Sequence, residues 1–151
     1  MIRVDAAAED DVPAILDIEH ESFSPPWPHG ALLSEVFSED SFFAVARRRR
    51  LLRRSSPVVG FIILRRFGDD GELMQIAVDT GSRRQGIADI LMDAAFRQAA
   101  EWVLTSVFLE VRKSNEAAVA LYEKHGFEPV RIREAYYSDP TEDAVVMMRR
   151  W

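Results

Sequence analysis

The sequence contains no cysteine, and this absence excludes disulfide bonds, thiolate metal sites and a cysteine nucleophile. Its three histidines, His20, His29 and His125, lack the HExxH spacing of a zinc protease, so we expect no metal. No apolar run approaches the roughly 20 residues of a membrane span. Residues 1–11 are too polar for a secretory signal. We therefore expect a cytoplasmic protein without a membrane partner.

The composition is that of a globular protein. The 151 residues suit a single domain, 1–151, and the hydrophobic and charged shares of 48% and 29% suit one packed core. The formal net charge is -6, which argues against general affinity for nucleic acid and suits a basic protein or peptide substrate.

An arginine cluster is the exception to this acidic balance. It comprises Arg47–Arg50, Arg53 and Arg54, and Ser55, Ser56 and Pro57 follow it. Charge runs beside turn residues usually form solvated loops, which favours an exposed hairpin loop. Contact with RNA or phosphate is the alternative, but the aromatic side chains that stack on single-stranded bases are missing.

Periodicity predicts an α/β (α+β) fold with a mixed, mostly antiparallel central sheet flanked by helices. Apolar residues at helical spacing predict helices, and runs of β-formers predict strands. The predicted helices are Glu9–Phe23, a short one through Leu32–Phe37, Ile87 to about Val103, and Asn115–His125. The predicted strands are Ser41–Ala46, Val58–Leu64, Leu73–Val78, Val107–Val111, Pro129–Tyr137 and Asp143–Met148. The crossover from Leu73 to Val111 should join parallel strands with right-handed connectivity.

The loop before the long helix has the features of a phosphate site. Strand Leu73–Val78 leads into Arg83–Ala88, which opens that helix. Free backbone N–H groups and the positive helix end attract a phosphate, and Gly86 and Ala88 allow close approach to the backbone. The loop contains neither GxxxxGK[ST] nor GxGxxG.

Several segments together resemble the GNAT superfamily of N-acetyltransferases. Arg83-x-x-Gly86-x-Ala88 resembles the family's coenzyme A pyrophosphate loop. The other matching segments are Ile76–Asp79, Leu109–Arg112, Ser114–Ala118 and Leu121–Phe127. The resemblance implies the GNAT fold with a splayed parallel strand pair, and acetyl-CoA as co-substrate.

Further marks are similar to the RimI-like ribosomal-protein-alanine N-acetyltransferases. These are Ile18-Glu19, Pro26-Trp27, Ala135-Tyr136-Tyr137 and Glu142-Asp143-Ala144. The resemblance implies that the enzyme transfers an acetyl group to the α-amine of an N-terminal alanine, in a small-subunit ribosomal protein. The alternatives are other protein N-termini, lysines, small amines, or a coenzyme A-binding regulator without turnover.

The resemblance also implies coenzyme-binding residues. The backbone of Ile76, Ala77 and Val78 should bind the acetyl-pantetheine arm. The pyrophosphate and the rest of the arm should contact Arg83, Arg84, Gln85, Gly86, Ile87, Ala88, Asp89 and Asn115. The alternatives are a solvated role for the Arg83 and Arg84 side chains and an ordinary helix N-cap for Asn115.

Two residues are the candidates for catalysis. Glu110 is an acid within an apolar strand, where burial is costly without a purpose, and should be the general base. Tyr122 should be the general acid for the departing thiolate. The alternatives are a Glu110 that faces outward by strand alternation and a Tyr122 that packs in the core.

Four residues should border the acceptor side of the cleft and bind the peptide. They are Trp27, Tyr137, Glu142 and Asp143. The alternative for Trp27 is a core anchor.

Overall fold

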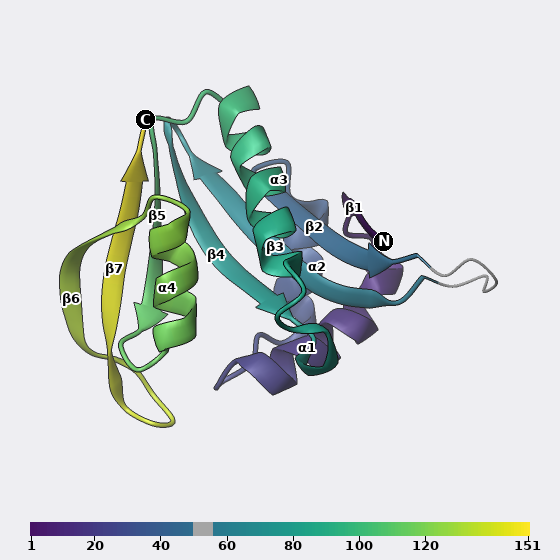
Figure 1. Cartoon of the computed structure of the whole chain (residues 1–151), viewed down its shortest axis with the longest axis horizontal. Helices are drawn as coiled ribbons and strands as arrows, with labels where there is room; N and C mark the ends of the chain where they lie inside the picture. Colours follow the sequence, from purple (N-terminus) through teal and green to yellow (C-terminus); the bar gives the residue numbers. More distant parts are fainter. Residues whose placement is uncertain (50–55) are drawn as a thin grey trace.

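A computed structural model describes residues 1–49 and 56–151. These residues form a sheet with helices on both sides (Figure 1). The elements are β1 (Ile2–Ala6), η1 (Glu9–Asp11), α1 (Val12–Ser22), α2 (His29–Phe37), β2 (Ser41–Arg48), β3 (Val58–Phe67), β4 (Asp70–Val78), η2 (Thr80–Ser82), α3 (Ile87–Glu101), β5 (Ser106–Arg112), α4 (Glu116–Lys124), β6 (Glu128–Tyr137) and β7 (Glu142–Arg150). No helix in the described residues has the length and apolar character to cross a membrane.

The strands of the described residues form one seven-stranded sheet in the order β1-β2-β3-β4-β5-β7-β6. Neighbouring strands are antiparallel except β4 and β5, which are parallel and are joined through α3. Parallel neighbours need such a crossover because a tight turn cannot join them. The predicted mixed sheet and its parallel crossover are therefore confirmed.

The parallel pair is splayed. Asp70–Glu72 pairs with Ser106–Phe108, and the pairing ends there. Beyond this point the two strands diverge toward their C-terminal ends (Figure 1). The splay leaves a gap in the sheet, as the family resemblance implied.

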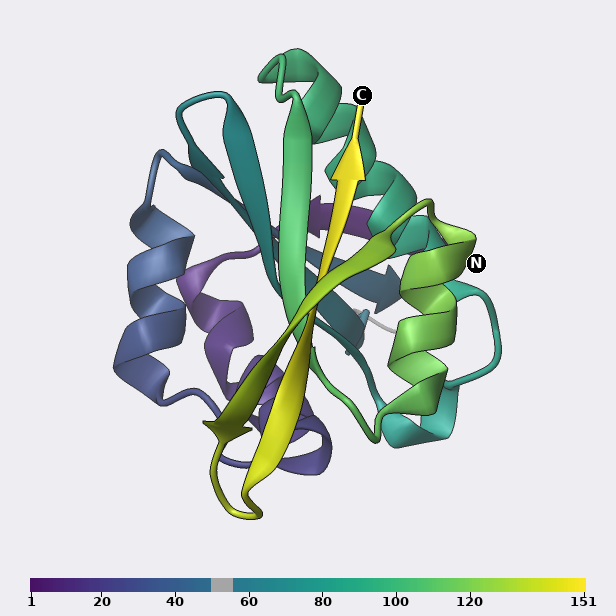
Figure 2. The ribbon, with the colours of Figure 1, turned by 90° about the vertical axis from the view of Figure 1, so that its left-hand side faces the viewer.

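Two apolar clusters hold the helices against the sheet. α1 and α2 lie on one face, and α3 and α4 lie on the other (Figure 2). Val12, Ile15 and Leu32 pack with β2 and β3 in the first cluster. Leu91 and Ala95 pack in the second. Burying an aliphatic side chain of this size contributes about 1.5–3 kcal/mol to the stability of the fold. The two clusters therefore fix the helices on the two faces of the sheet.

The edge strand β1 was not predicted. Its charged residues Arg3 and Asp5 alternate with apolar residues, which is the pattern of a half-buried strand, so the sequence carried a signal that was overlooked. The strand forms by antiparallel pairing with β2, from Ile2 opposite Arg48 to Ala6 opposite Ala44.

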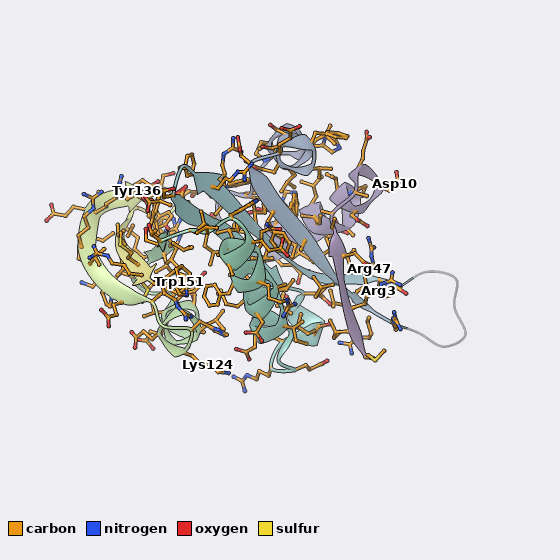
Figure 3. The ribbon with its side chains drawn as sticks, turned by 90° about the horizontal axis from the view of Figure 1, so that it is seen from above. Arg3, Asp10, Arg47, Lys124, Tyr136 and Trp151 are labelled. Atoms are coloured by element: carbon orange, nitrogen blue, oxygen red, sulfur yellow. The ribbon has the colours of Figure 1, made fainter. Side chains whose placement is uncertain are left out.

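The start of the arginine cluster is also corrected. β2 continues to Arg48, so Arg47 is a strand residue and not part of a solvated loop. Its guanidinium lies 2.9 Å from Asp5 Oδ2 and 2.7 Å from Asp11 Oδ2, and Arg3 binds the same Asp5 oxygen. Arg3 and Arg47 lie side by side on the paired strands β1 and β2 (Figure 3). The predicted loop residues 50–55 lie outside the described residues.

Candidate active site

The gap between β4 and β5 opens into a cleft of about 1010 Å³. Arg83, Arg84 and residues 86–89 border one end, which we call the loop end. Residues 23–28 and 136–138 border the other, the hairpin end. Ligand pockets usually measure about 300–1,000 Å³, so the cleft suits a large ligand.

The edge of β4 at the gap presents backbone N–H groups. Asp79 N–H donates to Val59 O at 2.8 Å, so strand alternation turns the N–H groups of Val78 and Ile76 away from β3. Pairing with β5 ends at Glu72, which leaves these groups facing the gap. A ligand chain lying in the gap can accept hydrogen bonds from them.

A β-bulge decides which β4 side chains face α1. The register between β3 and β4 shifts at Met74, which is the extra residue. Leu73, before the bulge, packs in the cluster beneath α3. Gln75, two positions later, instead donates from Nε2 to Glu19 Oε2 of α1 at 3.3 Å. The bulge therefore turns a polar side chain toward α1 at the wall of the cleft.

The loop end has the geometry of an anion site. Gly86 is the N-cap residue of α3, with a left-handed φ of 78° that favours glycine. No side chain caps the helix, and a Cβ at Gly86 would meet nothing within 4 Å. The first N–H groups of α3 are thus open to a ligand, and the helix dipole favours a negative one.

Most predicted coenzyme-binding residues line the cleft. They are Ile76, Ala77, Val78, Arg83, Arg84, Gly86, Ile87, Ala88, Asp89 and Asn115. Gln85 does not line it, and its Oε1 accepts a hydrogen bond of 2.7 Å from Arg48 Nη2. Asn115 Oδ1 accepts from Ala118 N–H at 3.2 Å and so caps α4. The cap occupies the carbonyl oxygen of Asn115 and leaves its amide nitrogen for a ligand.

Asp89 connects the two helices that flank the loop end. Its Oδ1 lies 2.7 Å from His125 Nε2 and 3.1 Å from Lys124 Nζ. Hydrogen bonds from His125 and Lys124 hold the pKa of the Asp89 carboxyl below its usual range. The contact fastens the start of α3 to the end of α4, where Gly126 adopts a left-handed φ of 87° and ends the helix.

Glu110 faces the cleft from β5. Its side chain is 13% exposed, and its Oε1 lies 3.3 Å from Arg133 Nε. Glu72 faces the same cleft from β4, and burial together with the charge of Glu110 raises its pKa. A hydrogen bond with Glu110 raises the pKa of Tyr136. Glu72 was missed because it follows the polar run Gly68–Gly71 and directly precedes the predicted strand, so it resembles a turn residue in the sequence.

Tyr122 is both a core residue and a cleft residue. It is 8% exposed, and its ring packs edge-on against Phe127 with centroids 5.9 Å apart. It also lines the cleft. Burial raises its pKa above the usual range, so the phenol stays protonated at neutral pH. The phenol therefore keeps its proton in the wall of the cleft.

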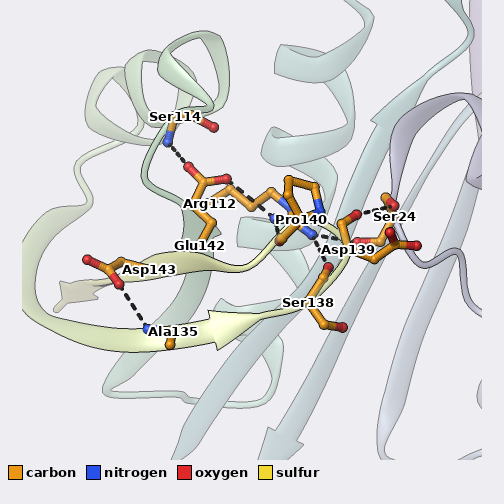
Figure 4. A network of polar contacts seen from close by, with 9 residues as sticks. All are labelled: Ser24, Arg112, Ser114, Ala135, Ser138, Asp139, Pro140, Glu142 and Asp143. Atoms are coloured by element: carbon orange, nitrogen blue, oxygen red, sulfur yellow. Dashed lines mark hydrogen bonds and ion pairs between the residues drawn. The ribbon is translucent and has the colours of Figure 1, made fainter.

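The four predicted acceptor residues divide into two pairs. Trp27 and Tyr137 line the hairpin end, and burial raises the pKa of Tyr137 to about 12. Glu142 and Asp143 do not line the cleft. Their carboxylates accept from backbone N–H groups, Glu142 from Ser114 at 2.6 Å and Asp143 from Ala135 at 2.9 Å (Figure 4).

Glu19 is a buried acid beneath the hairpin end that sequence reasoning did not single out as a site residue. It has no exposed surface, and burial raises its pKa to about 7. Its Oε2 accepts from Trp27 N–H at 2.9 Å as well as from Gln75. The signal was present, because Glu19 falls on the apolar helical spacing between Val12 and Phe23.

Comparison with known proteins decides the family. Residues 12–127 match the acetyltransferase (GNAT) family. The chain belongs to the GNAT family. It is 34% identical over 142 residues to the [ribosomal protein bS18]-alanine N-acetyltransferase of Escherichia coli strain K12, a match covering 91% of this chain and 89% of that protein.

Solved structures show the GNAT fold. The ribosomal-protein-S18-alanine N-acetyltransferase from Escherichia coli matches with a TM-score of 0.84 at 30% identity, over 99% of this chain and 94% of that one. The PaiA N-acetyltransferase from Thermoplasma acidophilum, in complex with coenzyme A, matches with a TM-score of 0.78 at 17% identity, over 100% and 99%. The chain is thus an N-acetyltransferase of a family that uses acetyl-CoA.

Proposed function

We propose that this GNAT enzyme transfers the acetyl group of acetyl-CoA to the N-terminal α-amine of a ribosomal protein whose first residue is alanine. Relatives named for this activity in Escherichia coli and Haemophilus ducreyi match 91% and 95% of the chain. The observation that carries the proposal is one cleft that joins an anion-binding loop, a splayed strand pair and the side chains of Glu110 and Tyr122. A ribosomal substrate places the enzyme in the cytoplasm.

The residues of the loop end fit coenzyme A. The open space at Gly86 and the uncapped N–H groups of α3 suit a pyrophosphate. Arg83 and Arg84 are exposed beside them and add positive charge. The N–H groups of Ile76 and Val78 suit the amide oxygens of the pantetheine arm, and one of them can donate to the thioester carbonyl oxygen. Bound acetyl-CoA supplies an acetyl group activated as a thioester.

Glu110 accepts the proton of the acceptor amine. An α-amine has a pKa of about 7.7–8.0, so much of it is protonated at neutral pH and must lose a proton before it attacks. The Glu110 carboxylate faces the cleft and takes that proton directly or through water. The freed nitrogen then forms the new N–C bond as the C–S bond of the thioester breaks.

Tyr122 supplies the proton that the leaving sulfur needs. Its buried phenol remains protonated, because burial disfavours the phenolate. Transfer of this proton converts the thiolate to a thiol. The nitrogen loses a second proton as it becomes an amide, and this proton returns to the Tyr122 phenolate through solvent, which completes the proton balance. The absence of cysteine fits direct attack without a covalent acyl-enzyme.

The remaining cleft residues favour a cationic peptide terminus. Glu72 and Glu110 place two carboxyl groups in the cleft wall, which attract an ammonium group. Trp27 and Tyr137 border the hairpin end and provide aromatic surface for the first residues of a peptide.

A pair of matched peptides tests the function. The first has a free N-terminal alanine in the sequence of bS18 and an internal lysine, and the second is identical except that its α-amine is formylated. With acetyl-CoA, we expect one acetyl group on the α-amine of the first peptide and none on the second, by intact mass and fragmentation. Equal lysine acetylation of both peptides would instead identify a lysine acetyltransferase. Acetyl-CoA binding without any transfer would support a regulator.

A further inference from the structure

Arg112 makes a dense set of contacts at the hairpin end. It lies two residues after Glu110, on the same face of β5, and its side chain is 19% exposed. The guanidinium donates to four oxygen atoms of other segments. These are Ser24 O at 2.6 Å, Ser138 O at 2.8 Å, Pro140 O at 2.9 Å and Glu142 Oε1 at 3.4 Å (Figure 4).

The four acceptors belong to two segments that border the cleft. Ser24 lies in the α1–α2 connection, which carries Trp27. The others lie in or next to the β6–β7 turn, which follows Tyr137. Ser24 Oγ also donates to Asp139 O at 2.7 Å, so the two segments bind each other directly. Arg112 therefore fixes both walls of the hairpin end to β5 and to one another.

Glu142 extends this network to α4. Its carboxylate accepts from Ser114 N–H at 2.6 Å as well as from Arg112. Hydrogen bonds from Ser114 and Arg112 lower the pKa of Glu142, which keeps it ionised at neutral pH. The acid that the sequence assigned to the substrate thus joins the β6–β7 turn to the loop before α4.

The geometry requires arginine. A planar guanidinium binds several oxygens in fixed directions, whereas a lysine ammonium is a single point of charge. The guanidinium also lies over the ring of Tyr137, 4.6 Å from its centroid, and both residues line the cleft. A lysine at position 112 retains the charge but cannot make all these contacts together.

We propose that Arg112 is a positioning residue that sets the separation between residues 23–28 and 138–141, and through it the acceptor site at the hairpin end. This inference rests on the proposed function in taking the hairpin end as the acceptor site. The Arg112 side chain does not contact the loop end, and its backbone oxygen, which accepts from Asn115 N–H at 3.0 Å, remains in any variant, so its replacement should act mainly on acceptor binding. A positive charge at position 112 is not enough for this role, because the several N–H donors of the guanidinium bind both segments at once.

Steady-state kinetics of Arg112→Lys and Arg112→Gln test the proposal. We expect the KM for the N-terminal peptide to rise about 10- to 100-fold, with a change of less than about twofold in the KM for acetyl-CoA. Ser24→Ala removes the direct bond to Asp139 and retains the carbonyl that Arg112 binds, so it should raise the peptide KM less. Unchanged peptide KM in folded Arg112 variants, or equal increases for both substrates, would overturn the proposal.

Arg66→Lys is the matched control. Arg66 also forms an ion pair, 3.2 Å from Asp40, and also packs on an aromatic ring, 5.0 Å from the centroid of Trp102. It does not line the cleft. Arg66 is more exposed than Arg112, so this variant should lose less stability and should leave both KM values unchanged. It controls for the loss of an arginine that pairs with an acid and packs on an aromatic ring away from the cleft.

Hydrogen exchange separates this inference from the proposed function. In Arg112→Lys, the amides of the non-proline residues in 23–28 and 138–141 should exchange faster together, while those of residues 83–89 keep the wild-type rate. If the wild-type enzyme does not acetylate peptide N-termini, the proposed function fails and hydrogen exchange alone decides the role of Arg112. Unchanged exchange in both segments would show that Arg112 does not hold them.

Discussion

Replacing Glu19 with glutamine should make the protein more stable at alkaline pH. The buried carboxyl has a pKa raised from 4.5 to about 7 by desolvation. Unfolding returns the group to water and its ordinary pKa, so between these values the folded protein binds the extra proton. Stability therefore falls as the pH rises from about 4.5 to about 7. Glutamine cannot ionise, and its carbonyl oxygen can still accept from Trp27 N–H.

The magnitude follows from the two pKa values. Each pKa unit corresponds to about 1.4 kcal/mol, so ionisation of Glu19 costs the folded state up to about 3 kcal/mol above pH 7. Glu19→Gln should match the wild type near pH 5 and exceed it by up to that amount near pH 8.5. Its amide can also donate to Gln75 Oε1, which has no partner among the described residues.

Urea unfolding followed by tryptophan fluorescence measures this difference across the pH range. The control is Asp17→Asn, which removes an exposed acid two residues earlier on α1. Its stability relative to the wild type should be constant above pH 5. The reasoning is refuted if Glu19→Gln and the wild type show the same pH dependence, or if the variant is the less stable at pH 8.5.

Three further predictions concern the cleft and the end of α4. Gly86→Glu places bulk and negative charge at the loop end, so calorimetry should show acetyl-CoA binding weakened by at least about tenfold, and unchanged affinity in a folded variant contradicts the site. Tyr122→Phe removes the proton donor, and because burial raises the pKa of Tyr122 above the usual range, kcat/KM should fall throughout the accessible pH range; an unchanged kcat/KM assigns Tyr122 to packing alone. Gly126→Ala forces a side chain into left-handed backbone and should cost about 1–2 kcal/mol in thermal unfolding, whereas an unchanged Tm contradicts that strain.

Local patterns predicted the parts of the site whose geometry is local. The loop through Gly86 could be predicted because a glycine directly before a segment of helical periodicity indicates a residue in the left-handed conformation at the start of a helix. The parallel pair β4 and β5 could be predicted because a long helix lies between two apolar strand segments, and such a helical crossover joins parallel strands. Glu110 stands out because a charged residue is rare in an apolar strand.

Features that depend on distant partners were not readable. Glu142 and Asp143 looked like substrate residues, but backbone groups 28 and 8 residues away occupy their carboxylates. The β4 bulge has no local signal, and without it the contact between Gln75 and Glu19 cannot be foreseen. Glu19 lies on the apolar helical spacing, which indicates burial, but its contacts with Trp27 and Gln75 depend on how α1 packs against β4.

The pH dependence of kcat/KM for wild type and Glu110→Gln tests the central claim most directly. Glutamine keeps the size of Glu110 and removes its ability to accept a proton from the N-terminal ammonium. With an alanine-terminated peptide, we predict a loss of about 10²- to 10⁴-fold near neutral pH that recovers partly as rising pH deprotonates the free amine. Near-normal rates for the variant from about pH 6 to about pH 10 would contradict the assignment of Glu110 as the proton acceptor.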